Sequence, residues 1–116
     1  MPANLLARQA RLWYWQRISA MVLAVCVLVH LATIIFAVRG GLGAGEILAR
    51  TQGNWAFGLF YLVFVVAVTV HAPIGLARIA EEWLGLQTRA SNLLAGLFAA
   101  VLLALGLRAV WAVFAA

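Results

Sequence analysis

The chain has 116 residues, of which 67% are hydrophobic and only 9% are charged. A soluble domain carries roughly a quarter charged residues, and a chain this short has too little interior to hide so much apolar surface. The net charge of +5 comes from arginines at the ends of apolar runs, which argues against a nucleic-acid-binding protein. This placement predicts contact with lipid headgroups or with an acidic docking face of a partner.

Three apolar runs are each long enough for a helix that crosses the bilayer core, which takes roughly 20 residues. These runs cover residues 18–38, 55–79 and 93–115. A glycine-rich loop at 39–46 separates the first two runs, Asn54 is expected to cap the second helix, and a short polar turn at 80–90 precedes the third. The sequence therefore predicts an all-α integral membrane protein, with residues 1–116 forming one domain, a bundle of three transmembrane helices.

The arginines are divided unequally between the two ends of the predicted bundle. One end has Arg8, Arg11, Arg17, Arg78 and Arg89, and the other has Arg39, Arg50 and Arg108. Because the cytoplasmic ends of membrane helices carry the excess of positive charge, we expect the N-terminus in the cytoplasm. The chain is then a multi-pass protein of the inner (cytoplasmic) membrane of the cell.

The first predicted helix carries one polar stripe on an otherwise apolar surface. Its members are Ser19, Cys26, His30 and Thr33, at spacings that place them on one face. Such a stripe faces protein or a cofactor rather than lipid. Ionisable groups inside a membrane are costly and are often functional, which makes His30 a candidate site residue.

The second predicted helix contains His71, with Ala67 one turn before it and Gly75 one turn after it. Small residues on both sides of a histidine leave room for a flat, bulky ligand against the backbone. Neutral imidazole is a common axial ligand of haem iron, and two of them make a centre suited to electron transfer. The alternative for each histidine is a hydrogen bond across a helix interface.

The two histidines are expected at different depths. His30 lies roughly 18 Å and His71 roughly 12 Å from the cytoplasmic ends of their helices, a difference of roughly 6–8 Å. This offset disfavours one haem held by both residues of one chain. Either each histidine pairs with one from another chain, or only His71 is a ligand.

The third predicted helix carries small residues at four-residue spacing, namely Gly96, Ala100 and Ala104. Small residues repeated in this way let neighbouring helices approach closely. We therefore expect this helix to have a packing role.

Two short segments carry a family resemblance. Residues 71–83 (HAPIGLARIAEEW) resemble the haem-ligating segment of the membrane-anchor subunits of succinate dehydrogenase and fumarate reductase. In that family a histidine is followed four residues later by glycine, and an acidic residue and an aromatic one close the helix. Residues 16–20 (QRISA) are similar to the family's His-Arg-x-Ser-Gly stretch at the start of the first helix.

The resemblance implies roles for particular residues. His71 matches the axial ligand of haem b. The residues that match the quinone site are Arg17, Ser19, Glu82 and Trp83. Trp83 stands where the family has a tyrosine, and an indole N–H can donate to a quinone oxygen but cannot relay a proton. Arg78, two turns beyond His71, is a candidate partner of a haem propionate, with a lipid headgroup as the alternative.

His30 departs from one branch of the family. Members with one haem and two anchor chains need no ligand at this place, whereas two-haem, single-anchor members have histidines in the first and second helices of each half. The chain resembles one such half. This implies that two three-helix chains, identical or homologous, hold one or two haems between them.

The leading hypothesis is a haem b-containing membrane anchor of a succinate:quinone oxidoreductase. Flavoprotein and iron–sulfur subunits would carry out the succinate chemistry, and this chain, with no catalysis of its own, would pass electrons to membrane quinone. A second hypothesis is a haem-free anchor or assembly protein. A small transporter is a weaker one, because no carboxylate lies deep in any apolar run.

Overall fold

The computed structural model describes residues 2–115, and within them the chain forms four helices. Their bounds are α1 Ala3–Gly40, α2 Ala44–Thr51, α3 Trp55–Leu84 and α4 Thr88–Phe114. α1, α3 and α4 are each long and apolar enough to cross a membrane. The structure thus confirms the predicted all-α membrane protein with three spans, although α1 begins well before the predicted span.

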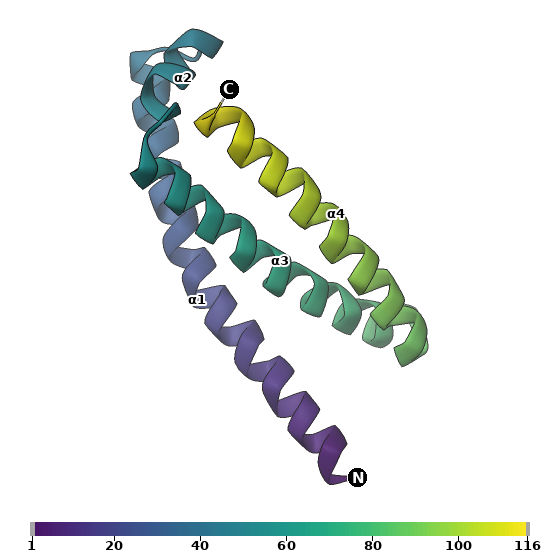
Figure 1. Ribbon diagram of the computed structural model, residues 1–116. Coiled ribbons are helices and arrows are strands. Elements are labelled where there is room, and N and C mark those ends of the chain that lie inside the picture. The colour runs from purple at the N-terminus through teal and green to yellow at the C-terminus, as the bar shows by residue number, and fades with distance from the viewer. Residues whose placement is uncertain (1, 116) are drawn as a thin grey trace.

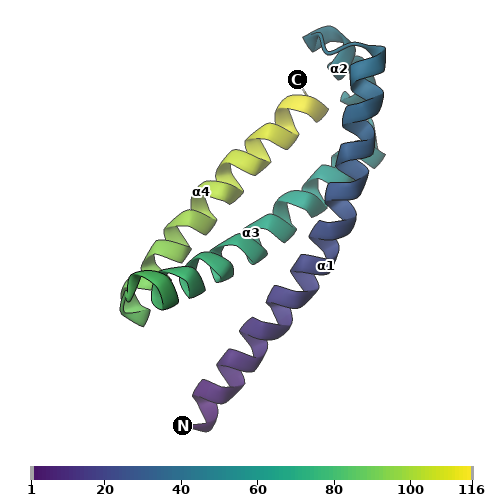
Figure 2. The ribbon, with the colours of Figure 1, turned by 180° about the vertical axis from the view of Figure 1, so that it is seen from behind.

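α3 is the central helix of the described chain, because it packs against both α1 and α4, while α2 contacts α4. The N-terminus and the turn between α3 and α4 lie toward one end of the molecule, and α2 lies at the other (Figures 1 and 2). The molecule is 55 Å long, and a helix of 38 residues such as α1 is about 57 Å long. α1 therefore runs the full length, and its first turns extend past the turn between α3 and α4.

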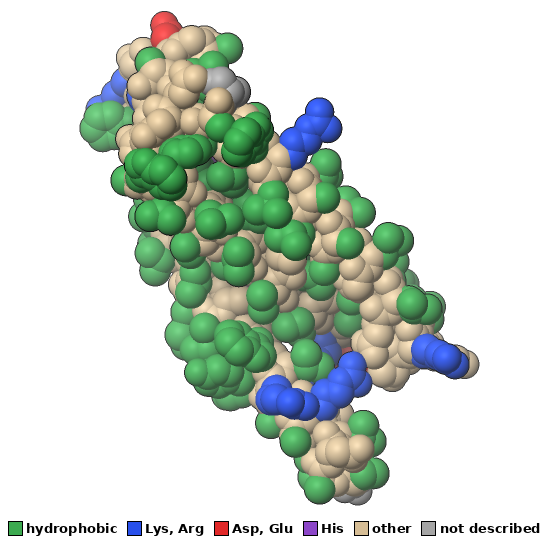
Figure 3. Space-filling model, viewed as in Figure 1, with side chains coloured by type: hydrophobic (Ala, Val, Ile, Leu, Met, Phe, Trp, Pro, Cys, Tyr) green, Lys and Arg blue, Asp and Glu red, His purple; other side chains and the backbone are tan. Residues whose placement is uncertain are grey.

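The surface agrees with a membrane-spanning bundle. Apolar side chains cover the middle of the face in Figure 3, and arginines stand toward its two ends. Lipid is the natural cover for such a middle section. The cytoplasmic position of the N-terminus and the identity of the membrane stay predictions.

α2 is a difference from the prediction, which left this stretch without a helix. The turn before it depends on Gly41, whose φ of +112° and contact with the Glu46 carboxylate leave no place for a Cβ. The Arg50 guanidinium donates to the Gly41 carbonyl at 2.7 Å. The Thr51 hydroxyl donates to the Val113 carbonyl at 2.7 Å, which fastens α2 to the last turn of α4. Long-range contacts therefore hold this short helix.

The two ends of α3 are set by local chemistry. The Asn54 side chain accepts hydrogen bonds from the backbone N–H groups of Ala56 at 3.1 Å and Phe57 at 3.4 Å, which confirms it as the N-cap. At the other end Gly85 adopts the left-handed conformation, with φ +65°. The Leu86 N–H then donates to the Ala80 carbonyl at 3.1 Å and closes the helix.

Small residues set the distances between the helices. Ser19 of α1 and Ala67 of α3 are buried where these two helices meet. On α4 it is Gly106 that faces α3, and a Cβ there would lie 2.6 Å from a methyl group of Val65. Close approach at small residues is the usual way in which membrane helices pack.

The small-residue stripe predicted to pack is not in close contact with α3. Gly96, Ala100 and Ala104 are all exposed in the described chain, and an added Cβ at Gly96 would meet none of the described atoms within 4 Å. This stripe therefore does not pack α4 against α3 within the described chain, and its packing role stays a prediction. The face of α4 that meets α3 is set by Gly106 instead.

Candidate functional site

His71 lies on α3 with one ring nitrogen turned toward α1. Its Nδ1 is 3.4 Å from the Ser19 hydroxyl oxygen and 3.4 Å from the Gln16 carbonyl oxygen. The Ser19 hydroxyl in turn donates to that same carbonyl at 3.1 Å. Because a carbonyl oxygen only accepts, this geometry favours the tautomer with the proton on Nδ1. Within residues 2–115 the other nitrogen, Nε2, has no hydrogen-bond partner and keeps a free lone pair.

The small residues around His71 serve the helix interface. Ala67 is buried, and a Cβ added to Gly75 would lie 3.4 Å from the side-chain nitrogen of Gln16. α1 therefore lies against the side of α3 where the sequence predicted room for a flat ligand. The close approach brings the Gln16 carbonyl and Ser19 within reach of His71. A groove of about 360 Å³ remains beside them between α1 and α3, lined almost wholly by apolar side chains.

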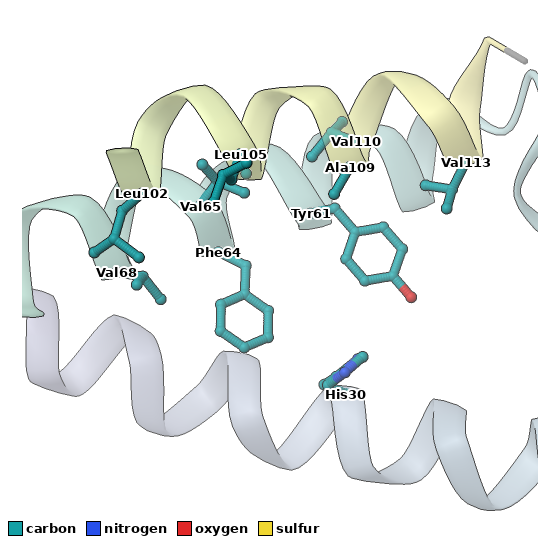
Figure 4. A pocket seen from close by; sticks show the side chains of 11 residues that line it. His30, Tyr61, Phe64, Val65, Val68, Leu102, Leu105, Ala109, Val110 and Val113 are labelled. Carbon is teal, nitrogen blue, oxygen red and sulfur yellow. The ribbon is translucent and has the colours of Figure 1, made fainter. Parts of the chain in front are cut away.

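His30 lies on α1 in a different setting. Its ring meets those of Phe64 and Tyr61 edge-on, with centroids 5.6 Å and 6.0 Å away. Figure 4 shows His30 pointing toward these two rings of α3, beneath residues of α4. The hollow between the three helices has a volume of about 540 Å³. The Nδ1 atom of His30 is buried and has no hydrogen-bond partner among the described residues.

The two histidines are farther apart in depth than the sequence predicted. His71 lies level with Ser19 of α1, and Ser19 and His30 are eleven residues apart along that helix. Eleven residues of α-helix rise about 16 Å, against the predicted 6–8 Å. The two imidazoles of one chain therefore lie at clearly separate levels.

The structure does not bring the expected quinone-site residues together within one chain. These residues are Arg17, Ser19, Glu82 and Trp83. Ser19 is buried against His71, whereas the Arg17 guanidinium lies over the Trp13 ring, 5.0 Å from its centroid. Trp83 is 82% exposed on the last turn of α3, and its neighbour Glu82 is also exposed. Trp83 comes twelve residues after His71, a rise of about 18 Å.

Arg78 lies on the exposed side of α3 and forms no ion pair within the described chain. It lines a hollow of about 290 Å³ between α1, α3 and α4. The groove beside Ser19 and Ala67 has a different lining that does not include Arg78. The proposed contact of Arg78 with a haem propionate stays a prediction.

Gln16 is a site residue that sequence reasoning treated only as a departure from the family motif. Its carbonyl faces His71 Nδ1, and its side-chain oxygen is buried without a hydrogen-bond partner among residues 2–115. The sequence feature that could have identified Gln16 is its position one turn before Ser19, on the same face of α1 as the polar stripe.

These features define a three-span membrane protein with imidazoles at two depths. The family described as succinate dehydrogenase/fumarate reductase transmembrane subunit matches residues 6–111, and the chain belongs to this family. No curated protein and no solved structure matches it. Membership confirms the resemblance and identifies the chain as a membrane subunit of this type of oxidoreductase complex.

Proposed function

We propose that this chain is a haem b-containing anchor that passes electrons between an iron–sulfur partner subunit and membrane quinone. The observation that supports the haem role is the orientation of His71. Its Nδ1 faces the Gln16 carbonyl and the Ser19 hydroxyl, and its Nε2 is free within the described chain. Metal-ligating histidines almost always donate their other ring N–H to a backbone carbonyl, carboxylate or water, which orients the ring.

The residues present fit one axial position at the level of His71. His71 would hold the haem iron, and His30 of the same chain is about 16 Å away along α1, too far to share that iron. The second ligand therefore comes from another chain, a three-helix anchor identical or homologous to this one. When bound, haem supplies reversible one-electron chemistry between the iron–sulfur centre and quinone.

We also propose a haem site at the level of His30, where the setting differs from that of His71. Its buried Nδ1 has no hydrogen-bond partner among residues 2–115, and a hollow of about 540 Å³ adjoins the ring. We propose that two chains place their His30 side chains around a second haem. The ring packing of Tyr61 and Phe64 holds the imidazole in place.

The quinone site is proposed at the end of the bundle that carries Arg17 and Trp83. Ser19 and Trp83 of one chain are separated by about 18 Å along the helix direction, which is far longer than a quinone ring. We propose that Trp83 contributes at the outer end of this site and Arg17 and Ser19 at its deeper end, with residues of the iron–sulfur partner subunit completing it. The indole N–H would donate to a quinone oxygen, and another group must deliver the protons.

A haem-free anchor or assembly protein is the second candidate. The contact of His71 with Gln16 and Ser19 across the helix interface favours it, since such a contact satisfies one ring nitrogen without any cofactor. To distinguish the two, the native complex is isolated through a tag on this chain from haem-replete cells. The proposal predicts a b-type band in the dithionite-reduced minus oxidised spectrum, together with flavoprotein and iron–sulfur subunits. If both subunits are isolated with the chain but the b-type band is absent, the chain is a haem-free anchor.

A further inference from the structure

A polar hollow opens at the end of the bundle where α1 begins and α3 and α4 meet. It has a volume of about 290 Å³ and is lined by residues from all three long helices. Figure 3 shows arginine side chains around a hollowed area near this end of the molecule. Neither histidine lines it.

The polar part of the lining favours an anion. Arg8 of α1 and Arg78 of α3 both line it, and Glu81 is the acidic residue in the lining. No ion pair is formed by these three side chains within residues 2–115. The arginines are therefore not neutralised by the nearby carboxylate, and guanidinium groups are well suited to phosphate oxygens.

The start of α4 adds donors on the same side. Thr88, the first residue of this 27-residue helix, and Asn92 one turn later both line the hollow. The N-cap residue Gln87 makes no side-chain hydrogen bond to the helix end. The first N–H groups of α4, at the positive end of the helix dipole, are thus available to an anion. Two arginines and a helix end converge on one space.

The rest of the lining is apolar and includes several small residues. Pro73 and Ala77 of α3 and Ala95, Gly96 and Ala99 of α4 belong to this part of the lining. These residues belong to the apolar runs, whereas the polar residues stand at the ends of the runs or beyond them. A ligand that fits this order of surfaces has a negatively charged head at the membrane interface and an apolar chain that enters the bilayer.

We propose that this hollow binds the headgroup of an anionic phospholipid, with the phosphate between Arg8 and Arg78. An acyl chain lies over Gly96 and continues into the surrounding bilayer. The proposal does not depend on haem at either histidine. It also gives Gly96, whose position has open space around it, a role in lipid contact.

For the test, the complex is purified and its lipid is removed by detergent exchange. The complex is then titrated with phosphatidylglycerol or with phosphatidylcholine. Native mass spectrometry gives the dissociation constant of the first bound lipid. Arg8→Gln and Arg78→Gln should each raise the dissociation constant for phosphatidylglycerol about five-fold, because one arginine near the headgroups contributes about 1 kcal/mol. Arg11→Gln and Arg89→Gln remove charge at the same end without touching the hollow and should leave this constant unchanged.

A charge-neutral variant provides the second arm. Gly96→Leu places a side chain in the hollow, where none of the described atoms obstructs its Cβ, and should displace the lipid while the bundle keeps its thermal stability. Millimolar inorganic phosphate should not compete, because it lacks the acyl chain.

Equal losses in all four arginine variants would overturn the proposal in favour of general surface attraction. Unchanged lipid binding with a raised KM for quinone in Gly96→Leu would assign the hollow to quinone instead. Loss of haem in Arg78→Gln with lipid binding intact would assign this arginine to a propionate.

Discussion

Ser19 and His71 are 52 residues apart in the chain, yet the Ser19 hydroxyl oxygen lies 3.4 Å from His71 Nδ1. The contact joins α1 to α3 and involves the Gln16 carbonyl, which both side chains face. It leaves the ring with one nitrogen engaged and the other free, the arrangement that a metal-ligating imidazole requires. The proposed haem function depends on this relationship.

Ser19→Ala tests the contact itself. The variant removes one of the two groups near Nδ1 and leaves the Gln16 carbonyl, so haem should be retained. A weaker hydrogen bond makes the imidazole less basic and stabilises the ferric state less, which raises the midpoint potential. A net hydrogen bond of about 0.7 kcal/mol corresponds to a shift of about 30 mV for a one-electron couple. A redox titration followed at the b-type band measures the shift.

The matched control is Ser91→Ala, which removes the hydroxyl of a fully buried serine at the start of α4. That serine makes no hydrogen bond through its hydroxyl within the described chain. A midpoint potential that moves equally in both variants would mean that Ser19 has no specific influence on His71.

His30→Leu tests the second haem position. If His30 holds a haem as proposed, the variant should halve the haem bound per anchor chain and remove a spectrally distinct component. Pyridine haemochrome analysis against protein concentration measures the ratio. Thr33→Ala, one turn away on the same helix, is the control and should keep both components. An unchanged ratio in His30→Leu would make His30 a packing residue beside Tyr61 and Phe64.

Two glycines of α4 offer a matched test of helix packing. Gly106→Ala places a Cβ 2.6 Å from a methyl group of Val65, and overpacking of this kind costs about 1–3 kcal/mol. Gly96→Ala adds the same atom in open space, and alanine is the better helix former. Thermal unfolding followed by circular dichroism in one detergent should show a lower Tm for Gly106→Ala alone. Equal Tm values would contradict the packing of α3 against α4.

The spans and the capping of α3 were predictable because their causes are local. Apolar runs of sufficient length require a membrane, and the Asn54 cap depends on residues two and three positions later. α2 was not predictable in this way, since its end is held by Thr51 against Val113, which is 62 positions away.

The candidate site was predictable in its residues but not in its arrangement. The sequence singled out His71, Ser19 and the small residues around them, yet which neighbour fills the space beside Ala67 and Gly75 depends on how α1 approaches α3. The same holds for α4, where nothing in the sequence distinguishes the packed Gly106 from the open Gly96. The depth of His30 relative to His71 also required the pairing of the helices to be known.

The central claim is that His71 is an axial haem ligand, and His71→Gly with and without added imidazole tests it most directly. The measurement is the reduced minus oxidised spectrum of the intact complex purified through this chain. We predict that His71→Gly loses one b-type component, that imidazole in the growth medium and buffers restores it at least in part, and that Ser19→Ala keeps it. A His71→Gly complex with the spectrum and the haem content of the unmodified protein would contradict the account.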